Sequence, residues 1–256
     1  MLGDQLAAFR VAVQFLTRLP VPGGAGPLAD HARLLRQSVI YFPLVGTLIG
    51  MLTGGVILLS SQVWPWPIAV LLGLAFDALL TGAFHEDALA DFCDAFGGGW
   101  TREQILEILK DSRLGTFGVL GLLTGVSLRA VALIHIDSSQ LLMVLLASST
   151  LGRWAILPAM ALVPPVPERA SIARDVAAQI NWRVVGVGTL WMLPGYAWLL
   201  GFRPYLALGL VVGVTFAVWQ FGRYVQHRID GITGDCLGAA CYVVQVVVLL
   251  AAIGSM

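Results

Sequence analysis

The stretch SVIYFPLVGTLIGMLTGGVILLS, residues 38–60, contains no charged side chain and is long enough to cross a lipid bilayer as one helix. A helix needs about 20 apolar residues to span about 30 Å of hydrocarbon. Comparable segments recur, and we place spans at 38–60, 66–84, 115–134, 140–163, 184–202, 205–222 and 237–254. The sequence therefore predicts an all-α, polytopic membrane bundle of about seven transmembrane helices plus surface amphipathic helices, forming one domain over residues 1–256.

Composition agrees with a membrane protein. The chain is 58% hydrophobic and 12% charged, whereas soluble domains are about 45–50% apolar and about 25% charged. The formal net charge is zero, so charge balance gives no reason to expect nucleic-acid binding. The cysteine count is odd and lacks C-x-x-C spacing, which argues against a disulfide framework and a zinc knuckle.

Basic residues are distributed unevenly between the two sets of connections. Arg203 alone falls on one side, while Arg129 and Arg153 fall within spans. The other side carries Arg10, Arg18, Arg33, Arg36, Arg102, Lys110, Arg113, Arg169, Arg174, Arg183, Arg223 and Arg228. The positive-inside rule then predicts a cell inner membrane protein in lipid, with its N-terminus and the basic loops in the cytoplasm.

Two shorter segments are typical of helices at the membrane surface. Residues 5–19 are apolar but carry Arg10 and Arg18, which favours an interfacial helix, although an eighth crossing stays open. Residues 101–110, TREQILEILK, begin with the N-cap candidate Thr101 and predict an amphipathic helix on the cytoplasmic surface.

Acidic residues gather in TGAFHEDALADFCDAFGGG, residues 81–99. If the second span continues through this stretch, Asp87, Asp91 and Asp94 are spaced i, i+4 and i+7 and share one helical face. Glu86 lies off that face but is a further candidate metal ligand. Hard oxygen donors favour magnesium, manganese or calcium over zinc, and we expect Mg²⁺ bound together with a phosphate. A solvated acidic helix end is the alternative explanation.

The segment KDSRLGTFG, residues 110–118, has the composition of a phosphate-binding loop. Arg113 can bind phosphate oxygens bidentately, Lys110 supplies a point charge, and Asp111 and Ser112 lie between them. Ordinary positive-inside anchoring would explain the same cations.

A third polar segment, GITGDCLGAA at residues 231–240, precedes the last span. An acid at the mouth of a span, here Asp235, is a functional hypothesis by default. Thr233 and Gly234 are candidate substrate-binding residues beside it. The alternative is that Thr233 or Asp235 caps the helix.

Three charged residues fall at membrane depth: Asp77, Arg129 and Arg153. Asp77 either lines the same cavity as the acidic cluster or pairs with a span arginine such as Arg153. A secondary transporter would use these charges as an ion route. No internal repeat is visible and the acids crowd one surface, so transport is disfavoured.

The chain resembles the cobalamin 5'-phosphate synthase family in five successive segments. They are FLTRLPVP (15–22), YFPLVGTLIG (41–50), TGAFHEDALADFCDAFGGG (81–99), EILKDSRLGTFG (107–118) and GITGDCLGAA (231–240). The family's acidic motif has glycines where Ala88 and Ala95 stand, and its last motif commonly has threonine at Cys236. A lipid-type alcohol phosphotransferase is the nearest alternative, but its D-G-x-x-A-R motif is absent.

The resemblance implies an enzyme that joins adenosylcobinamide-GDP to α-ribazole or its 5'-phosphate, releasing GMP, with magnesium as cofactor. The resemblance is also compatible with an oligomer. His85 or Asp91 is the candidate general base, and this choice stays open. The resemblance marks as catalytic His85, Asp91, Asp111, Arg113 and Asp235, and as substrate-binding Lys110, Ser112, Arg113, Thr233 and Gly234.

Overall fold

A computed structural model describes residues 2–22, 28–167 and 180–254, so Arg169 and Arg174 of the basic set lie outside it. Its helices, with one 3-10 turn, are α1 (Leu2–Leu16), α2 (Leu28–Ser38), η1 (Val39–Tyr41), α3 (Phe42–Ser60), α4 (Trp66–Thr81), α5 (Phe84–Gly98), α6 (Arg102–Ile108), α7 (Thr116–Ile134), α8 (Ser138–Leu162), α10 (Trp182–Leu190), α11 (Leu193–Phe202), α12 (Pro204–Ile229) and α13 (Gly234–Gly254). Extended pairing within these residues is limited to one isolated bridge between Pro165 and Ile232.

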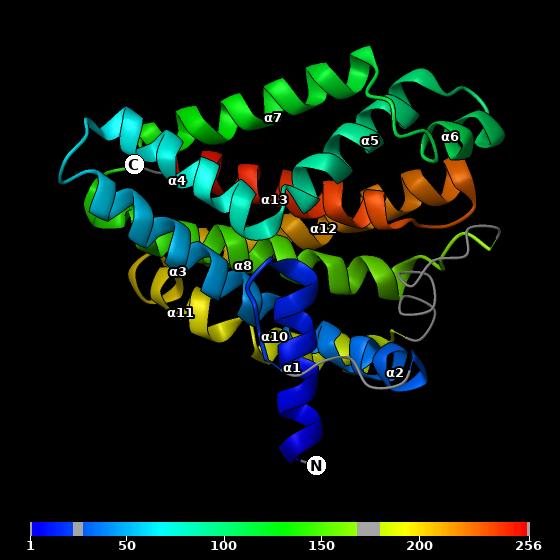
Figure 1. Ribbon diagram of the computed structural model, residues 1–256, viewed down its shortest axis with the longest axis horizontal. Coiled ribbons are helices and arrows are strands. Elements are labelled where there is room, and N and C mark those ends of the chain that lie inside the picture. Colours follow the sequence, from blue (N-terminus) through cyan, green and yellow to red (C-terminus); the bar gives the residue numbers. More distant parts are fainter. Residues whose placement is uncertain (1, 23–27, 168–179, 255–256) are drawn as a thin grey trace.

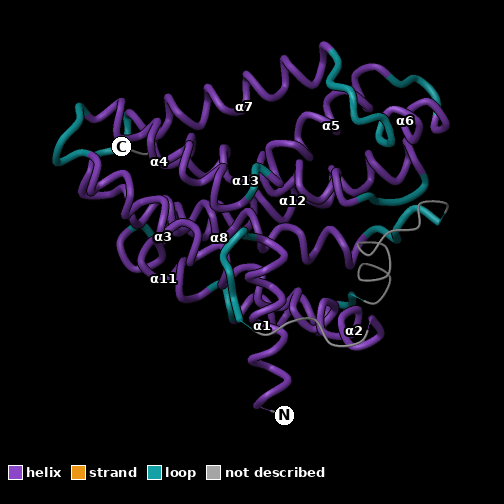
Figure 2. The backbone as a smooth tube through the Cα atoms, in the orientation of Figure 1, coloured by secondary structure: helices purple, strands orange, loops and turns teal. Residues whose placement is uncertain are grey.

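The long helices form a membrane-type bundle. Six helical segments of the described chain are long and apolar enough to cross a membrane, and the number is seven if the bent pair α4–α5 forms one span. They lie alongside one another in Figure 1, while α1 stands across them. Most loops gather at the two ends of the bundle (Figure 2). The predicted all-α polytopic bundle is confirmed.

Helix α8 forms the centre of this bundle. Of its most apolar window 89% is buried, and it packs chiefly against α3 and α13. Close approach depends on small residues: a Cβ added at Gly50 would lie 2.8 Å from the carbonyl oxygen of Leu145, and one at Gly152 would lie 2.8 Å from that of Cys241. Without a hydrophobic drive between helices in lipid, such backbone contact supplies the packing energy.

Two predicted spans differ in detail from the structure. The span predicted at 184–202 is divided into α10 and α11, which meet near Met192, with a proline opening α11. The span predicted to end at residue 222 continues as α12 to Ile229. Hydropathy missed this last part because His227 and Arg228 make it polar.

The second span does not continue straight into the acidic stretch, so the condition stated for the shared face of Asp87, Asp91 and Asp94 is met by a separate helix, α5. Helix α4 ends at Thr81, and α5 leaves at an angle of 87°. Between them Gly82 and Ala83 both adopt left-handed backbone conformations, with φ of 71° and 56°. The backbone amide of Arg18 donates to the carbonyl oxygen of Leu80 at 2.7 Å. The segment after α1 thus satisfies a carbonyl that the end of α4 leaves free.

Both shorter segments are helical as predicted. Helix α6 has a full capping box, in which Thr101 accepts from the amide of Gln104 and the Gln104 side chain accepts from the amide of Thr101. Helix α1 is anchored to η1 through a hydrogen bond from the Tyr41 hydroxyl to Gln5. Their placement at a membrane surface stays a prediction.

Candidate active site

The three polar segments of the sequence meet at one end of the bundle, on the right of Figure 1. Arg102 of α6 forms an ion pair with Asp230 after α12, with 3.1 Å between Nε and Oδ2. Arg228 Nη2 donates to the backbone oxygen of Gly99 at 2.7 Å. These links join the end of α5 to the turn before α13. Sequence reasoning had counted the two arginines only as basic residues.

Helices α5 and α13 also touch directly below this end. A Cβ added at Gly238 would collide with the side chain of Ala88. Leu89 of α5 packs with Ala239 and Tyr242 of α13 in a small buried cluster. Ala88, which stands where the family motif has glycine, therefore fills the space opposite a glycine of α13. The acidic stretch and the 231–240 segment are one packing unit.

The acids of α5 differ sharply in exposure. Asp87 is exposed, Asp91 is half-buried and Asp94 is buried. Their spacing places them on one side of the helix as predicted. Toward the end of α5 this side is increasingly covered, because α5 packs against α7 and α13.

Asp94 is held by the start of α7. Its two carboxylate oxygens accept from the backbone amides of Gly115 and Gly118, each at 2.7 Å. A Cβ added at either glycine would run into that carboxylate. A negative charge at the first amides of a helix is stabilising. Asp94 thus fixes the 110–118 segment against α5.

The acids on the outer side of α5 do not form a ready three-acid cage for a magnesium ion. In the part of the chain that the structure describes, no group of three or more His, Cys, Asp or Glu side chains could hold a metal. Magnesium is usually held by one or two carboxylates together with substrate phosphates and water. Asp87 and Asp91, one turn apart, supply such a pair. The metal role of all four acids stays a prediction.

His85 and Glu86 lie on the inner side of α5. Glu86 Oε1 accepts from Arg129 Nη1 of α7 at 3.4 Å, rather than pointing with Asp87. His85 is only 2% exposed, and its Nε2 has no hydrogen-bond partner among the described residues. Of the two candidate bases, Asp91 is therefore the one that a substrate in solvent reaches more easily.

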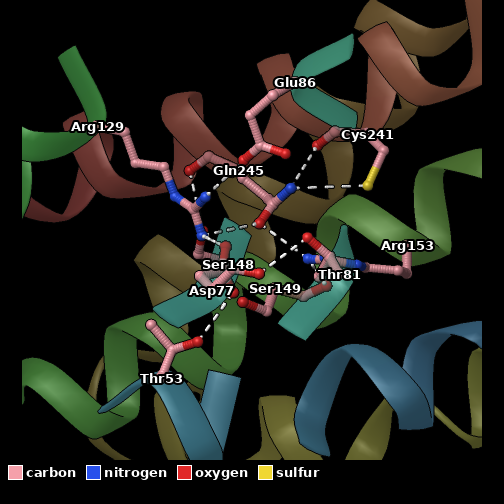
Figure 3. A network of polar contacts seen from close by, with 10 residues as sticks. All are labelled: Thr53, Asp77, Thr81, Glu86, Arg129, Ser148, Ser149, Arg153, Cys241 and Gln245. Carbon is pink, nitrogen blue, oxygen red and sulfur yellow. Dashed lines mark hydrogen bonds and ion pairs between the residues drawn. The ribbon is translucent and has the colours of Figure 1, made fainter. Parts of the chain in front are cut away.

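Beneath α5 lies a buried polar network at membrane depth (Figure 3). Arg129 Nη2 pairs with Asp77 Oδ2 of α4 at 2.8 Å, and Thr53 donates to the other oxygen of Asp77 at 2.8 Å. Of the two alternatives for Asp77, pairing with a span arginine is the one observed, but the partner is Arg129 rather than Arg153. Arg153 instead donates to Gln245 at 2.8 Å. Gln245 was missed, although a lone amide within an apolar span is the kind of signal that marks such networks.

Two of the candidate phosphate-binding residues in the 110–118 segment, Arg113 and Asp111, form an exposed ion pair with each other. Arg113 Nη2 approaches Asp111 Oδ2 at 2.6 Å, and its Nε donates to both carboxylate oxygens at 3.0 Å. These hydrogen bonds lower the pKa of Asp111 and raise that of Arg113. Lys110 and Ser112 are exposed beside the pair. The planar guanidinium of Arg113 can donate two hydrogen bonds to one anion, and here it donates them to the Asp111 carboxylate.

At the start of α13 the helix-cap interpretation is confirmed for Thr233. Its hydroxyl accepts from the amide of Cys236 at 3.4 Å and lies 3.4 Å from Asp235 Oδ2. Gly234 is exposed and Asp235 is half-buried. The catalytic role of Asp235 stays a prediction.

Comparison with known proteins identifies the family of the chain. The family model described as cobalamin-5-phosphate synthase matches residues 8–253. The chain belongs to this family. An adenosylcobinamide-GDP ribazoletransferase of Leptothrix cholodnii is 37% identical over 246 residues, covering 91% of this chain and 89% of that protein. A protein of the same name from Ralstonia pickettii is 35% identical over 252 residues, covering 97% and 95%. No solved structure matches the fold significantly.

Proposed function

We propose that this protein joins adenosylcobinamide-GDP to α-ribazole or α-ribazole 5'-phosphate, with release of GMP, in the nucleotide-loop assembly step of cobamide synthesis. The observation that carries the proposal is the family match over nearly the whole chain, with relatives named adenosylcobinamide-GDP ribazoletransferase. The meeting of the three polar segments at one end of the bundle supports the proposal.

The reaction is a phosphoryl transfer. A ribose hydroxyl attacks the phosphorus attached to the cobinamide arm, a new phosphorus–oxygen bond forms, and the bond to the GMP oxygen breaks. The hydroxyl proton passes to a base, and Asp91 is better exposed for this than His85. In such transfers positioning and neutralisation of the phosphate charge provide most of the catalysis.

Asp87 and Asp91 are the residues that would hold Mg²⁺, and Asp94, which is bound to the start of α7, would support them from the same helix. When bound, the ion neutralises the diphosphate and stabilises the attacking and leaving oxygens. Glu86 contacts Arg129 and would contribute as a ligand only after turning outward. The requirement for magnesium is part of the proposal.

Arg113 would bind the diphosphate of adenosylcobinamide-GDP by exchanging Asp111 for phosphate oxygens. A bidentate fork suits both anions, and the exposed loop leaves room for the exchange. Asp111 then keeps the fork oriented while no substrate is bound. Lys110 and Ser112 add a charge and a hydroxyl at the same loop, and Thr233, Gly234 and Asp235 would contact substrate from the start of α13.

We further propose that this end of the bundle faces the cytoplasm across the cell inner membrane. Of the cations at this end, Arg102, Lys110, Arg113 and Arg228 lie in the described residues, and basic loops stay in the cytoplasm. Nucleotide-bearing substrates are supplied from that side. Lipid would then cover the apolar outer surface of the membrane-spanning helices. Association of several copies into an oligomer is compatible with this arrangement.

The proposal is tested by giving the purified protein, in liposomes, adenosylcobinamide-GDP, α-ribazole and magnesium. GMP and the joined cobamide should appear in equal amounts, and both should vanish when either substrate is omitted. GMP release without the joined product would indicate a hydrolase and contradict the proposal.

A further inference from the structure

One buried arginine connects the two helices on either side of the α4–α5 bend. Arg129 of α7 is 3% exposed. It pairs with Asp77 of α4 at 2.8 Å and with Glu86 of α5 at 3.4 Å. It also lies 3.5 Å from the side-chain oxygen of Gln245 on α13. Figure 3 shows Arg129 turned toward Asp77 and Glu86 from the opposite wall of the bundle.

This contact is costly to break. A charge at membrane depth is tolerated when it is paired inside the bundle. Removing one partner from a buried ion pair leaves an uncompensated charge. Here a single guanidinium compensates two carboxylates, so a shift of either helix away from Arg129 would strand an acid in an apolar setting. The network therefore resists relative movement of α4 and α5.

Direct contact between these two helices is limited. They are joined by Gly82 and Ala83 alone, both in left-handed conformations, and no helical hydrogen-bond ladder continues through the bend. Helix α5 packs mainly on α7 and α13 and touches α4 much less. The ion pairs with Arg129 thus add a side-chain link between α4 and α5, beside the packing of both helices on α7.

From this geometry we infer that Arg129 is a positioning residue for the acids on the outer side of α5. The inference rests on the proposed function, because it assigns Arg129 to the proposed metal site. Glu86, which Arg129 holds, immediately precedes Asp87 in the chain. Fixing Glu86 on the inner side fixes the direction in which Asp87 and Asp91 project.

The test compares Arg129→Lys with Arg153→Lys. Arg153 is a matched control because it is 1% exposed, lies in the same network and donates to Gln245 and to the Ser149 carbonyl oxygen. It takes no part in the ion pairs found among the described residues. A lysine at 129 keeps the charge but loses the planar fork that reaches two carboxylates.

Three quantities are measured on detergent-purified protein: Mn²⁺ binding by electron paramagnetic resonance, the Mg²⁺ concentration for half-maximal GMP release, and the melting temperature. For Arg129→Lys we expect Mn²⁺ affinity to fall about 10-fold, as when residues that orient metal ligands are replaced. The half-maximal Mg²⁺ concentration should rise in parallel. Arg153→Lys should melt earlier but bind Mn²⁺ like the unmodified protein.

Equal Mn²⁺ affinity in Arg129→Lys and the unmodified protein would overturn the inference, and so would an equal loss in Arg153→Lys. If Arg129→Lys does not fold, a triple variant is tested in its place: Asp77→Asn, Glu86→Gln and Arg129→Gln. All three new side chains are neutral, so this variant leaves no unpaired charge at these positions. That variant should also bind Mn²⁺ weakly, and unmodified affinity in it would count against positioning. Absence of both Mn²⁺ binding and Mg²⁺-dependent GMP release in the unmodified protein would instead overturn the proposed metal site, and the inference with it.

Discussion

The two sides of α5 carry neighbouring acids with different surroundings. Glu86 turns into the bundle and contacts a buried arginine, whereas Asp87, the next residue, is exposed. On the inner side a carboxylate is compensated within the protein and stabilises the fold. On the outer side a carboxylate is open to a ligand. One acidic run thus combines an anchor with a proposed binding surface, and changes on the two sides should have different consequences.

The largest expected effect lies on the inner side. Asp77→Asn removes the carboxylate that lies 2.8 Å from Arg129 and leaves that arginine short of a counter-charge. Breaking a buried pair in this way costs about 3–5 kcal/mol of stability. The melting temperature in detergent should fall strongly. Thr53→Val, which removes only the hydroxyl donor to Asp77, is the control and should fall less; equal melting of both variants would show that the pair contributes little.

On the outer side, Asp91→Asn should lower turnover about 100- to 1000-fold, the usual loss when a group that stabilises transition-state charge is removed. GMP release at saturating substrates measures it. A variant that keeps turnover near that of the unmodified protein would exclude Asp91 both as metal ligand and as base.

Asp94 lies between these two cases because it caps α7. Asp94→Ala removes the acceptor of two amides, and the loss of a helix cap costs about 0.5–2 kcal/mol. Asp94→Asn keeps one acceptor oxygen and should lose less. Thermal unfolding of the two variants should follow this order. The opposite order would mean that the asparagine amide cannot replace the carboxylate as an acceptor for the amides of Gly115 and Gly118.

The smallest expected effect concerns the exposed loop. Arg113→Lys should raise the KM for adenosylcobinamide-GDP about tenfold, which corresponds to about 1.4 kcal/mol, because a point charge does not replace a planar fork. Lys110→Arg should change KM less. Equal rates for Arg113→Lys and the unmodified enzyme at subsaturating substrate would exclude bidentate binding.

The bundle was predictable from sequence because each apolar segment carries its own signal of length and composition. The bend after α4 was not, since Gly82 and Ala83 continue an apolar helical pattern, and only the contacts of Arg18 and Arg129 show where the chain turns. The pairing of Asp77 with Arg129 rather than Arg153 likewise depends on how α4 and α7 face one another. Periodicity placed Asp94 with Asp87, but the partner that covers Asp94 belongs to α7, beyond the reach of a one-helix pattern.

The most direct test of the account compares Glu86→Gln with Asp87→Asn, two conservative changes at adjacent positions. GMP release is followed as a function of magnesium concentration, together with melting temperature. We expect Asp87→Asn to melt normally but to need far more magnesium or to lose turnover. Glu86→Gln, whose amide oxygen can still accept from Arg129, should melt earlier with nearly unchanged magnesium dependence. An equal rise in the magnesium requirement of both variants, or normal catalysis in Asp87→Asn, would contradict the division of roles between the two sides of α5.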